Sequence, residues 1–389
     1  MTKELSHYLE DVLSTGDLQS ITPIEKAIHG PSWSKSEQGK ALIQHLSSTD
    51  AYSEFNGHLQ MLGVGSIIVS LENLGDWLVE RASSDGVAQA EKDLSEYNNS
   101  DAFKAYAIML LANTHIDNEY EFESGVKLIH ASSLQNDLLN KSIQINSHEH
   151  SLPLPRTECI LAIPFEHKRF HWSSTGQDTE KPDIEIPYSL LEETKLCLVM
   201  ARPTRCGIQS IATSVVVEGN IPIIHSISGW SLHSFKRPPL GPSILNIEMN
   251  NANELIKKLK KLEPDLKQKI LSIIERLNGY SSGASMVEKS VDLRICLESI
   301  FLDDGNKEQL RYTLSLRAAL FLGENLEERK DIMSKMKKAY DVTSTAVHTG
   351  KMPSRNVELL PEIAGLARKS ILKLIEAGGI NWQELELQV

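Results

Sequence analysis

The sequence lacks most features that mark secreted, metal-binding and membrane proteins. Its 389 residues include only four cysteines, and none form a C-x-x-C pair: Cys159, Cys197, Cys206 and Cys296. Scattered thiols of this kind are typical of a reducing compartment and give no zinc or disulfide pattern. No run approaches the roughly 18 apolar residues of a membrane-spanning helix. Residues 1–10 lack the basic start and apolar core of a signal peptide. We therefore expect a cytoplasmic protein with no membrane attachment.

The chain also lacks repeats, nucleotide-binding motifs and an extreme composition. Hydrophobic residues make up 41% and charged residues 24% of the sequence, which excludes collagen-like, coiled-coil and wholly disordered proteins. Glycines occur in residues 59–74, but no G-K-[ST] ending follows them, so this segment is predicted to be a packed helix or strand. The G-x-S-x-G elbow of many hydrolases is absent as well. The length predicts two or three domains.

Positive charge is scarce in the first part of the chain. Residues 1–150 contain 9 Lys and Arg against 22 Asp and Glu, residues 151–285 contain 16 against 14, and residues 286–389 contain 15 against 16. Phosphate backbones are bound by clustered Lys and Arg. Any contact with nucleic acid is therefore expected in the last two thirds of the chain, as a local patch. The acidic first third is instead a candidate for docking a basic protein.

Hydrophobic patterning predicts an α+β protein in which the first two parts differ. Residues 1–115 are predicted to be a helical, acidic region, and its clearest helix is expected at residues 102–112 with Asp101 as N-cap. Residues 116–250 are predicted to be β-rich, because β-branched runs alternate there with turn signals. The expected strands cover residues 125–131, 158–165, 184–188, 195–201, 210–219, 221–227 and 243–249.

Helical periodicity dominates the rest of the chain. Residues 251–285 are predicted to be a helical connector, with helices at residues 254–262 and 266–277 on either side of Pro264. Residues 286–389 are predicted to be an all-α bundle with short connections. Its expected helices cover residues 286–302, 307–322, 326–348 and 359–377.

Four segments of this bundle, in order, carry a resemblance to a known family. They are VDLRICLESIF at 291–301, LRYTLSLRAALFLG at 310–323, MKKAYDVTSTAVHTG at 336–350 and NWQELELQV at 381–389. Together they resemble the Apea-like HEPN domains of bacterial defence and abortive-infection proteins, over about the last 105 residues. The resemblance implies an all-helical fold, frequent dimerisation and, in many members, metal-independent RNA cleavage without a cofactor. Nothing comparable is found in residues 1–285, which are expected to sense a trigger or a protein partner.

The family resemblance also implies roles for individual residues. His348 occupies the position of the family histidine, which moves protons at the ribose 2′-hydroxyl and the leaving oxygen, as suits a group that titrates near neutral pH. The family's arginine, which holds the scissile phosphate, is replaced by Thr343. Ser344 and Asp341 precede His348 by four and seven residues, so they share its helix face and are candidates to orient the ring.

Cations from elsewhere are then needed to hold RNA. The candidate RNA-binding residues are Arg311, Arg317, Lys351 and Arg355, and a second copy of the chain is another source. Three functions stay open: a metal-independent endoribonuclease, a HEPN module that dimerises or binds RNA without cleaving it, and a structural partner in a larger assembly. No metal or cofactor is predicted for any of them.

The middle of the chain holds weaker candidates. His148, Glu149 and His150 suit a solvated loop better than a metal site, since no second ligand pair is nearby. Residues 167–172 (HKRFHW) form a small basic and aromatic cluster of the kind that stacks on bases, although an exposed strand end explains it as well. Arg202, Arg205, Lys236 and Arg237 lie in predicted turns and can converge on one recognition surface.

Overall fold

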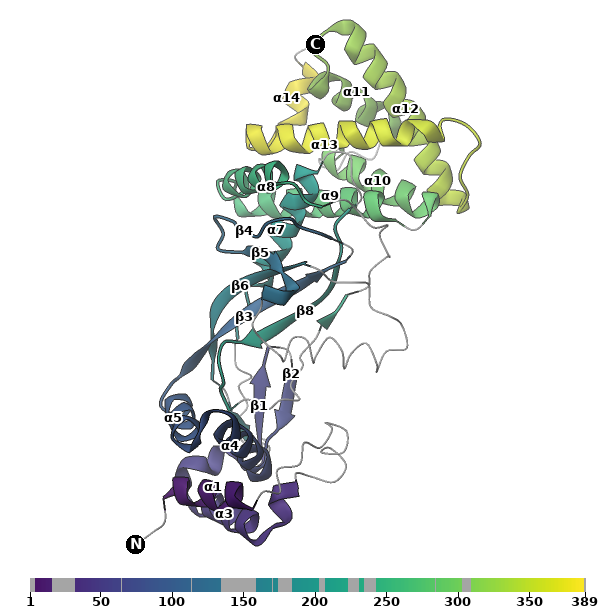
Figure 1. The fold of residues 1–389 in the computed structure, drawn as a ribbon. Coiled ribbons are helices and arrows are strands. Elements are labelled where there is room, and N and C mark those ends of the chain that lie inside the picture. The colour runs from purple at the N-terminus through teal and green to yellow at the C-terminus, as the bar shows by residue number, and fades with distance from the viewer. Residues whose placement is uncertain are drawn as a thin grey trace.

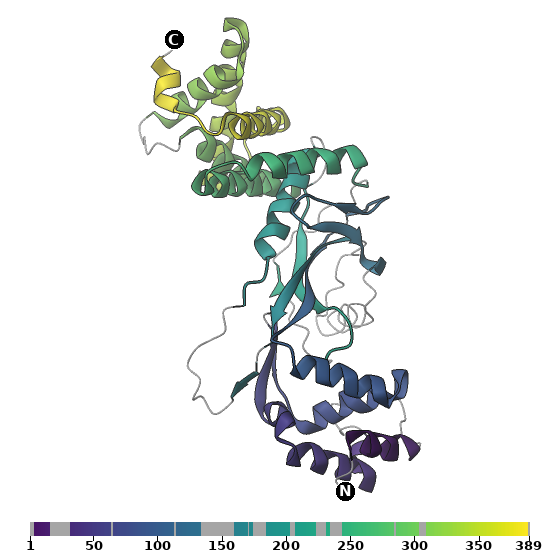
Figure 2. The same ribbon diagram turned by 90° about the vertical axis from the view of Figure 1, so that its left-hand side faces the viewer.

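The computed structural model shows an elongated molecule with its two termini at opposite ends (Figures 1 and 2). The structure describes residues 4–15, 32–63, 65–112, 114–133, 159–169, 171–173, 184–202, 207–222, 231–233, 243–283, 285–302 and 309–387. Helices form both ends, and a sheet lies between them. The predicted α+β class is confirmed.

Helices at the N-terminal end pack around a core of their own. They are α1 (Leu5–Ser14), α3 (Glu37–Ser48), α4 (Leu71–Asp85) and α5 (Val87–Asn98), with 3-10 turns at Ser32–Lys35 and Asp50–Phe55. Ser70 begins α4 with a capping box, because its hydroxyl accepts the Asn73 N–H while the Asn73 side chain accepts the Ser70 N–H. Leu9, Leu42 and Leu78 are fully buried between these helices.

Two antiparallel sheets connect the ends of the molecule. The smaller has the order β2-β1-β7, from β1 (His58–Leu62), β2 (Gly65–Ile68) and β7 (His171–Ser173). The larger has the order β4-β5-β6-β3-β8-β9. Its strands are β3 (Ala102–Leu111), β4 (Tyr120–Glu121), β5 (Lys127–His130), β6 (Cys159–Lys168), β8 (Ser210–Val217) and β9 (Ser231–Leu232), with a 3-10 turn at Ala131–Ser133.

The segment predicted as the clearest helix is instead β3, a central strand. Its sequence, AFKAYAIMLL, is rich in helix formers, but it pairs with β6 on one side and β8 on the other. Residues 107–112 are all buried, because cover on both faces of the strand removes the alternation that identifies most strands. Tertiary pairing therefore overrides the local helix preference of these residues.

The opposite error occurs at residues 195–201, which were predicted to be a strand. They belong to helix α7 (Tyr188–Ala201), whose last nine residues are buried and which packs on β3 and β6. Residues 196–201 (LCLVMA) are all apolar, so this part of the helix has no polar face to reveal its period. Residues 184–187 are not a strand either, and the expected strand at 243–249 contributes only an isolated bridge from Ile244 to Ile116 before a helix begins.

Seven helices form the C-terminal end among the described residues. They are α8 (Asn246–Leu259), α9 (Pro264–Ser282), α10 (Met286–Phe301), α11 (Leu310–Leu322), α12 (Leu326–Thr349), α13 (Leu360–Ala377) and α14 (Trp382–Leu387), with a 3-10 turn at Val357–Leu359. Pro264 begins α9, and Gly350 and Gly378, both left-handed, end α12 and α13. The four helices predicted for residues 286–377 are confirmed to within three residues, whereas α8 begins eight residues before the predicted helix at 254–262 and α9 ends five residues after the one at 266–277.

The predicted domain boundaries fall inside packed units. β3 lies before residue 116 yet belongs to the large sheet, and α8 begins before residue 251. One continuous core joins the sheet, α7, α8, α9 and the bundle from α10 to α14. Residues 251–285, in α8 and α9, pack on α7 on one side and on the bundle helices α10 and α13 on the other, and so belong to this continuous core (Figure 1).

Candidate functional site

Helix α12 presents His348 to solvent at its C-terminal end. Asn325 caps the start of the helix by accepting the Glu328 N–H at 3.0 Å, and Gly350 ends it with a φ of 66°. His348 therefore lies in the last turn, where a positive charge is favoured by the helix dipole. The ring is exposed and forms no hydrogen bond with any residue that the structure describes. It is accessible to a substrate.

The two residues predicted to orient His348 do not contact it. Asp341 accepts a hydrogen bond from Arg311 Nη2 at 2.8 Å, and this surface pair lies about 10 Å from His348 along the helix axis. Ser344 lies one turn before His348, is half-buried, and has no hydrogen bond to another described residue. The structure thus places all three on neighbouring turns, and only Ser344 lies within one turn of the histidine.

Thr343, which the resemblance places where HEPN domains carry an arginine, faces the interior of the bundle. Its side chain is fully buried, and its hydroxyl donates to the carbonyls of Ala339 (2.9 Å) and Tyr340 (3.2 Å). The position five residues before His348 is therefore not on the exposed face of α12. A side chain there lies between α12 and its neighbours α10 and α11.

Arg317 is wrongly predicted as an RNA-binding residue, because its guanidinium is buried. It is 1% exposed, donates from Nε to Glu386 Oε1 at 2.6 Å and from Nη1 to the Phe301 carbonyl at 2.7 Å, and lies 5.8 Å from the ring centre of Trp382. These contacts attach α14 and the end of α10 to α11. The residue has a structural role.

Lys351 and Arg355 are the cations nearest to His348 in the chain. Both are exposed, and neither forms an ion pair with a described residue. Gly350 turns the chain after α12, and the Lys351 N–H donates to Thr349 Oγ1 at 3.2 Å. The exposed residues His348, Lys351 and Arg355 lie within eight positions of one another, and this stretch of the chain is referred to below as the α12 end.

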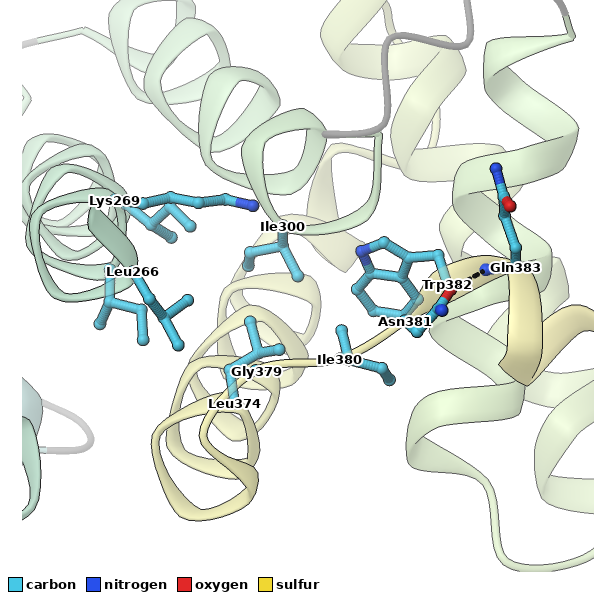
Figure 3. A pocket seen from close by; sticks show the side chains of 11 residues that line it. Leu266, Lys269, Ile300, Leu374, Gly379, Ile380, Asn381, Trp382 and Gln383 are labelled. Carbon is cyan, nitrogen blue, oxygen red and sulfur yellow. Dashed lines mark hydrogen bonds between the residues drawn. The ribbon is translucent and has the colours of Figure 1, made fainter. Parts of the chain in front are cut away.

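A separate pocket of about 320 Å³ lies beside α14 (Figure 3). Its apolar lining includes Leu266, Ile300 and Trp382, and its polar lining residues are Lys269, Asn381 and Gln383. The Gln383 N–H donates to Asn381 Oδ1 at 3.1 Å and so begins α14 (Figure 3). The volume is at the lower limit for ligand sites. None of the residues predicted from the sequence lines this pocket.

Within the basic and aromatic cluster at residues 167–172, the structure describes the side chains of His167, Lys168 and Arg169, of which only Lys168 is exposed. His167 is fully buried on β6 and stacks on Phe103 at 4.8 Å. Its Nε2 accepts the Gly63 N–H at 3.0 Å and its Nδ1 lies 2.8 Å from the Lys168 carbonyl, which fits a neutral ring protonated at Nδ1. Arg169 forms an ion pair with Glu54 at 2.7 Å. His167 thus joins β6 of the larger sheet to the end of β1 in the smaller one.

Acidification is expected to destabilise the protein through His167. Burial lowers the pKa of this histidine below its usual value of 6.5, so the unfolded chain binds more protons in that range. The stability contributed by the neutral ring is complete above about pH 6.5 and is lost as the pH falls through the lower folded pKa. Urea midpoints measured from about pH 7 to pH 5 should fall less steeply for His167→Gln than for wild type. Parallel curves for the two proteins would contradict this assignment.

A polar cluster that no sequence motif indicated lies at the edge of the large sheet. His233 Nδ1 is 2.7 Å from Ser210 Oγ, and His233 Nε2 is 3.3 Å from Thr213 Oγ1. Burial lowers the pKa of His233, and the nearby Glu192 charge opposes this shift. A serine in contact with a neutral imidazole is a nucleophile–base geometry, but a hydroxyl, and not a carboxylate, holds the second nitrogen. We interpret the cluster as support for the β8–β9 pairing.

Of the remaining predicted candidates, the structure describes only Arg202. Arg202 is buried, with its Nε 3.7 Å from Glu248 Oε2. The other candidates lie outside the described residues: His148, Glu149, His150, Arg205, Lys236 and Arg237. Residues 223–227 of the expected strand at 221–227 also lie outside them, and residues 221–222 are not a strand. Within the described part of the chain, no group of three or more His, Cys, Asp or Glu can hold a metal ion.

Two further findings concern the whole protein. None of the helices within the described ranges is both long enough and apolar enough to cross a membrane. The chain matches no protein-family model, no curated protein and no solved structure in the comparisons made. No similarity to a known protein therefore assigns a function to the α12 end or its surroundings.

Proposed function

We propose that this chain is a defence-type effector whose C-terminal HEPN-like bundle acts on RNA at the α12 end. The observation that carries the proposal is the exposed His348, whose ring has no hydrogen-bond partner among the described residues, followed in the chain by the exposed cations Lys351 and Arg355. Residues 1–285 would sense a trigger or a protein partner. The RNA would be the substrate of a metal-independent endoribonuclease.

The chemistry of such a site needs one proton acceptor, one proton donor and a cation. The ribose 2′-oxygen attacks the phosphorus, its proton passes to a base, and the 5′-oxygen leaves with a proton from an acid. His348 can perform one of the two proton transfers, and Lys351 or Arg355 can neutralise the phosphate. A second copy of the chain would supply the other histidine, so we propose that the active unit is a homodimer with two α12 ends facing each other. Val347, an apolar residue that is 46% exposed beside His348, fits such a contact.

An alternative is a HEPN-like module that dimerises or binds RNA or protein without cleavage. Its specific support is Thr343, because the family arginine is missing and this position faces the core. Lys351 and Arg355 then bind phosphates with no reaction at His348. The two functions predict different outcomes in one assay.

The test is incubation of the full chain with cellular RNA in EDTA, next to the His348→Ala variant. We expect wild type to produce fragments that end in 2′,3′-cyclic phosphate, and His348→Ala to lower the rate at least about 100-fold. His7→Ala is the matched control, since His7 is also an exposed histidine on a helix but lies at the other end of the molecule.

Other outcomes separate the alternatives. Cleavage that persists in His348→Ala would remove this residue from the mechanism. RNA binding without cleavage, equal in wild type and His348→Ala and weakened by Lys351→Gln, would favour the binding module. If neither RNA binding nor cleavage occurs, also after addition of a co-purifying partner, the proposal is wrong.

A further inference from the structure

A hollow on the surface of the bundle lies where α11 begins beside the middle of α12. It has a volume of about 440 Å³ and is lined by Gln309, Leu310, Arg311, Tyr312, Lys337 and Tyr340. We refer to it as the tyrosine hollow. It contains two aromatic rings and two cationic side chains within six lining residues, in a chain with only 6% aromatic residues.

Tyr312 is the most accessible ring of this hollow. It is 48% exposed, which is unusual for a large aromatic side chain, and the Lys337 ammonium lies 5.4 Å from its ring centre. Tyr340 is held in place from below, because the Arg294 guanidinium lies 3.7 Å from its ring centre and donates to Glu298. One ring is therefore free to stack on a ligand, and the other forms a fixed wall.

The charge of the hollow favours an anion. Lys337 has no carboxylate partner among the residues described, while Arg311 shares its charge with Asp341 at the protein surface. The lining contains no acidic residue. Exposed aromatic rings beside unpaired cations are the combination that binds single-stranded nucleic acid, since the rings stack on bases and the cations contact phosphates.

The position of the hollow relates it to His348. Lys337, Asp341, Ser344 and His348 follow one another at intervals of three or four residues and so share one face of α12. Lys337 and His348 are eleven positions apart, which corresponds to about 16 Å along the helix. A single strand can span this distance with a few nucleotides while it keeps contact with both places.

We propose that the tyrosine hollow binds an unpaired base of single-stranded RNA, which stacks on Tyr312 while Lys337 contacts the adjacent phosphate. This inference rests on the proposed function, because it names the form of RNA that would reach the α12 end and a place that fixes its register. Duplex RNA is excluded from such a site, since its bases are already stacked on one another.

The experiment measures fluorescence anisotropy of labelled oligouridine with the full chain. The oligonucleotide carries 2′-O-methyl groups, which block the attacking oxygen and prevent cleavage. Tyr312→Ala is expected to weaken binding about 10-fold, and Tyr312→Phe to retain it, because stacking on one base needs the ring but not the hydroxyl. Circular dichroism verifies that each variant is folded.

Lys337 is tested through the salt dependence of binding. Lys337→Gln is expected to reduce the slope of log affinity against log salt by about 0.7, the value for one lost phosphate contact on a single strand. Lys338→Gln is the matched control, because Lys338 is the next residue of α12, is exposed, and does not line the hollow. Its slope should equal that of wild type.

The outcomes distinguish this inference from the proposed function. Tight binding of oligouridine by wild type and equally by Tyr312→Ala would overturn the inference and leave the proposed function intact. Equal affinity for single-stranded and duplex RNA would also overturn it, because stacking on Tyr312 needs an unpaired base. Absence of any RNA binding by wild type would overturn the proposed function, and the inference with it. Selective capture of an acidic peptide in place of RNA would assign the hollow to a protein partner.

Discussion

Arg317→Ala is expected to lower the free energy of unfolding by about 3 to 5 kcal/mol, because it removes one partner of a buried ionic and hydrogen-bonded network. The substitution leaves the Phe301 carbonyl without its donor and removes the anchor of Glu386. It also opens a space beside Trp382, which packs on Phe301 and Phe321 with ring centres 5.5 and 5.4 Å away. The helix α14 should detach from the bundle in this variant.

Arg311→Ala is the control, since Arg311 lies on the same helix and also forms an ion pair. That pair is exposed, with side-chain accessibilities of 49% and 56% for Arg311 and Asp341, and such pairs contribute at most about 1 kcal/mol. Urea denaturation followed by tryptophan fluorescence measures both variants. Similar midpoints for the two would mean that burial gives Arg317 no special role in stability. Loss of RNA binding in a fully stable Arg317→Ala variant would restore it as an RNA-binding residue.

Thr343→Arg is expected to destabilise the bundle by more than about 4 kcal/mol and not to restore the family's catalytic pair. The position is fully buried on the inner side of α12, so the variant forces an unpaired guanidinium into the packing of α12 on α10 and α11. The threonine hydroxyl, by contrast, is satisfied locally by two backbone carbonyls.

Ser344→Arg tests whether an arginine near His348 promotes cleavage when it does not have to enter the core. Ser344 is the residue next to Thr343, but it is only half-buried and lies one turn before His348. We expect this variant to keep a thermal midpoint close to that of wild type and to bring a cation beside His348. A stable Thr343→Arg protein with increased RNA cleavage would contradict the placement of Thr343 in the core. Increased cleavage in Ser344→Arg alone would support it.

The C-terminal helices were predictable where local signals mark their ends. Asn325 and Gly350 delimit α12, and Pro264 marks the start of α9. Apolar residues at intervals of three and four then define the buried face. The two largest prediction errors concern β3 and α7. The second half of β3 and the last nine residues of α7 are buried, so polar and apolar residues do not alternate there with the period of a strand or a helix.

The site was predictable only in part, for a related reason. The exposure of His348 follows from its place in the last turn before a left-handed glycine. Whether a given arginine is available to bind RNA does not follow from the local sequence, because its partners lie far along the chain. Arg317 meets Glu386 after 69 positions and Arg311 meets Asp341 after 30. The tyrosine hollow likewise joins residues of two helices whose packing no single segment specifies.

Strand β3 contributes to all three hydrophobic cores among the described residues. Ala105 packs with the N-terminal helices, whereas Ala107, Met109 and Leu111 pack with the core that continues into the C-terminal bundle. Residues 108 and 110 of this strand, with Ala112 after it, belong to the third core, on the opposite face of the sheet. A slip of one residue in the register of this strand would turn its side chains to the opposite faces of the sheet. Such a slip would therefore disturb the packing at both ends of the molecule.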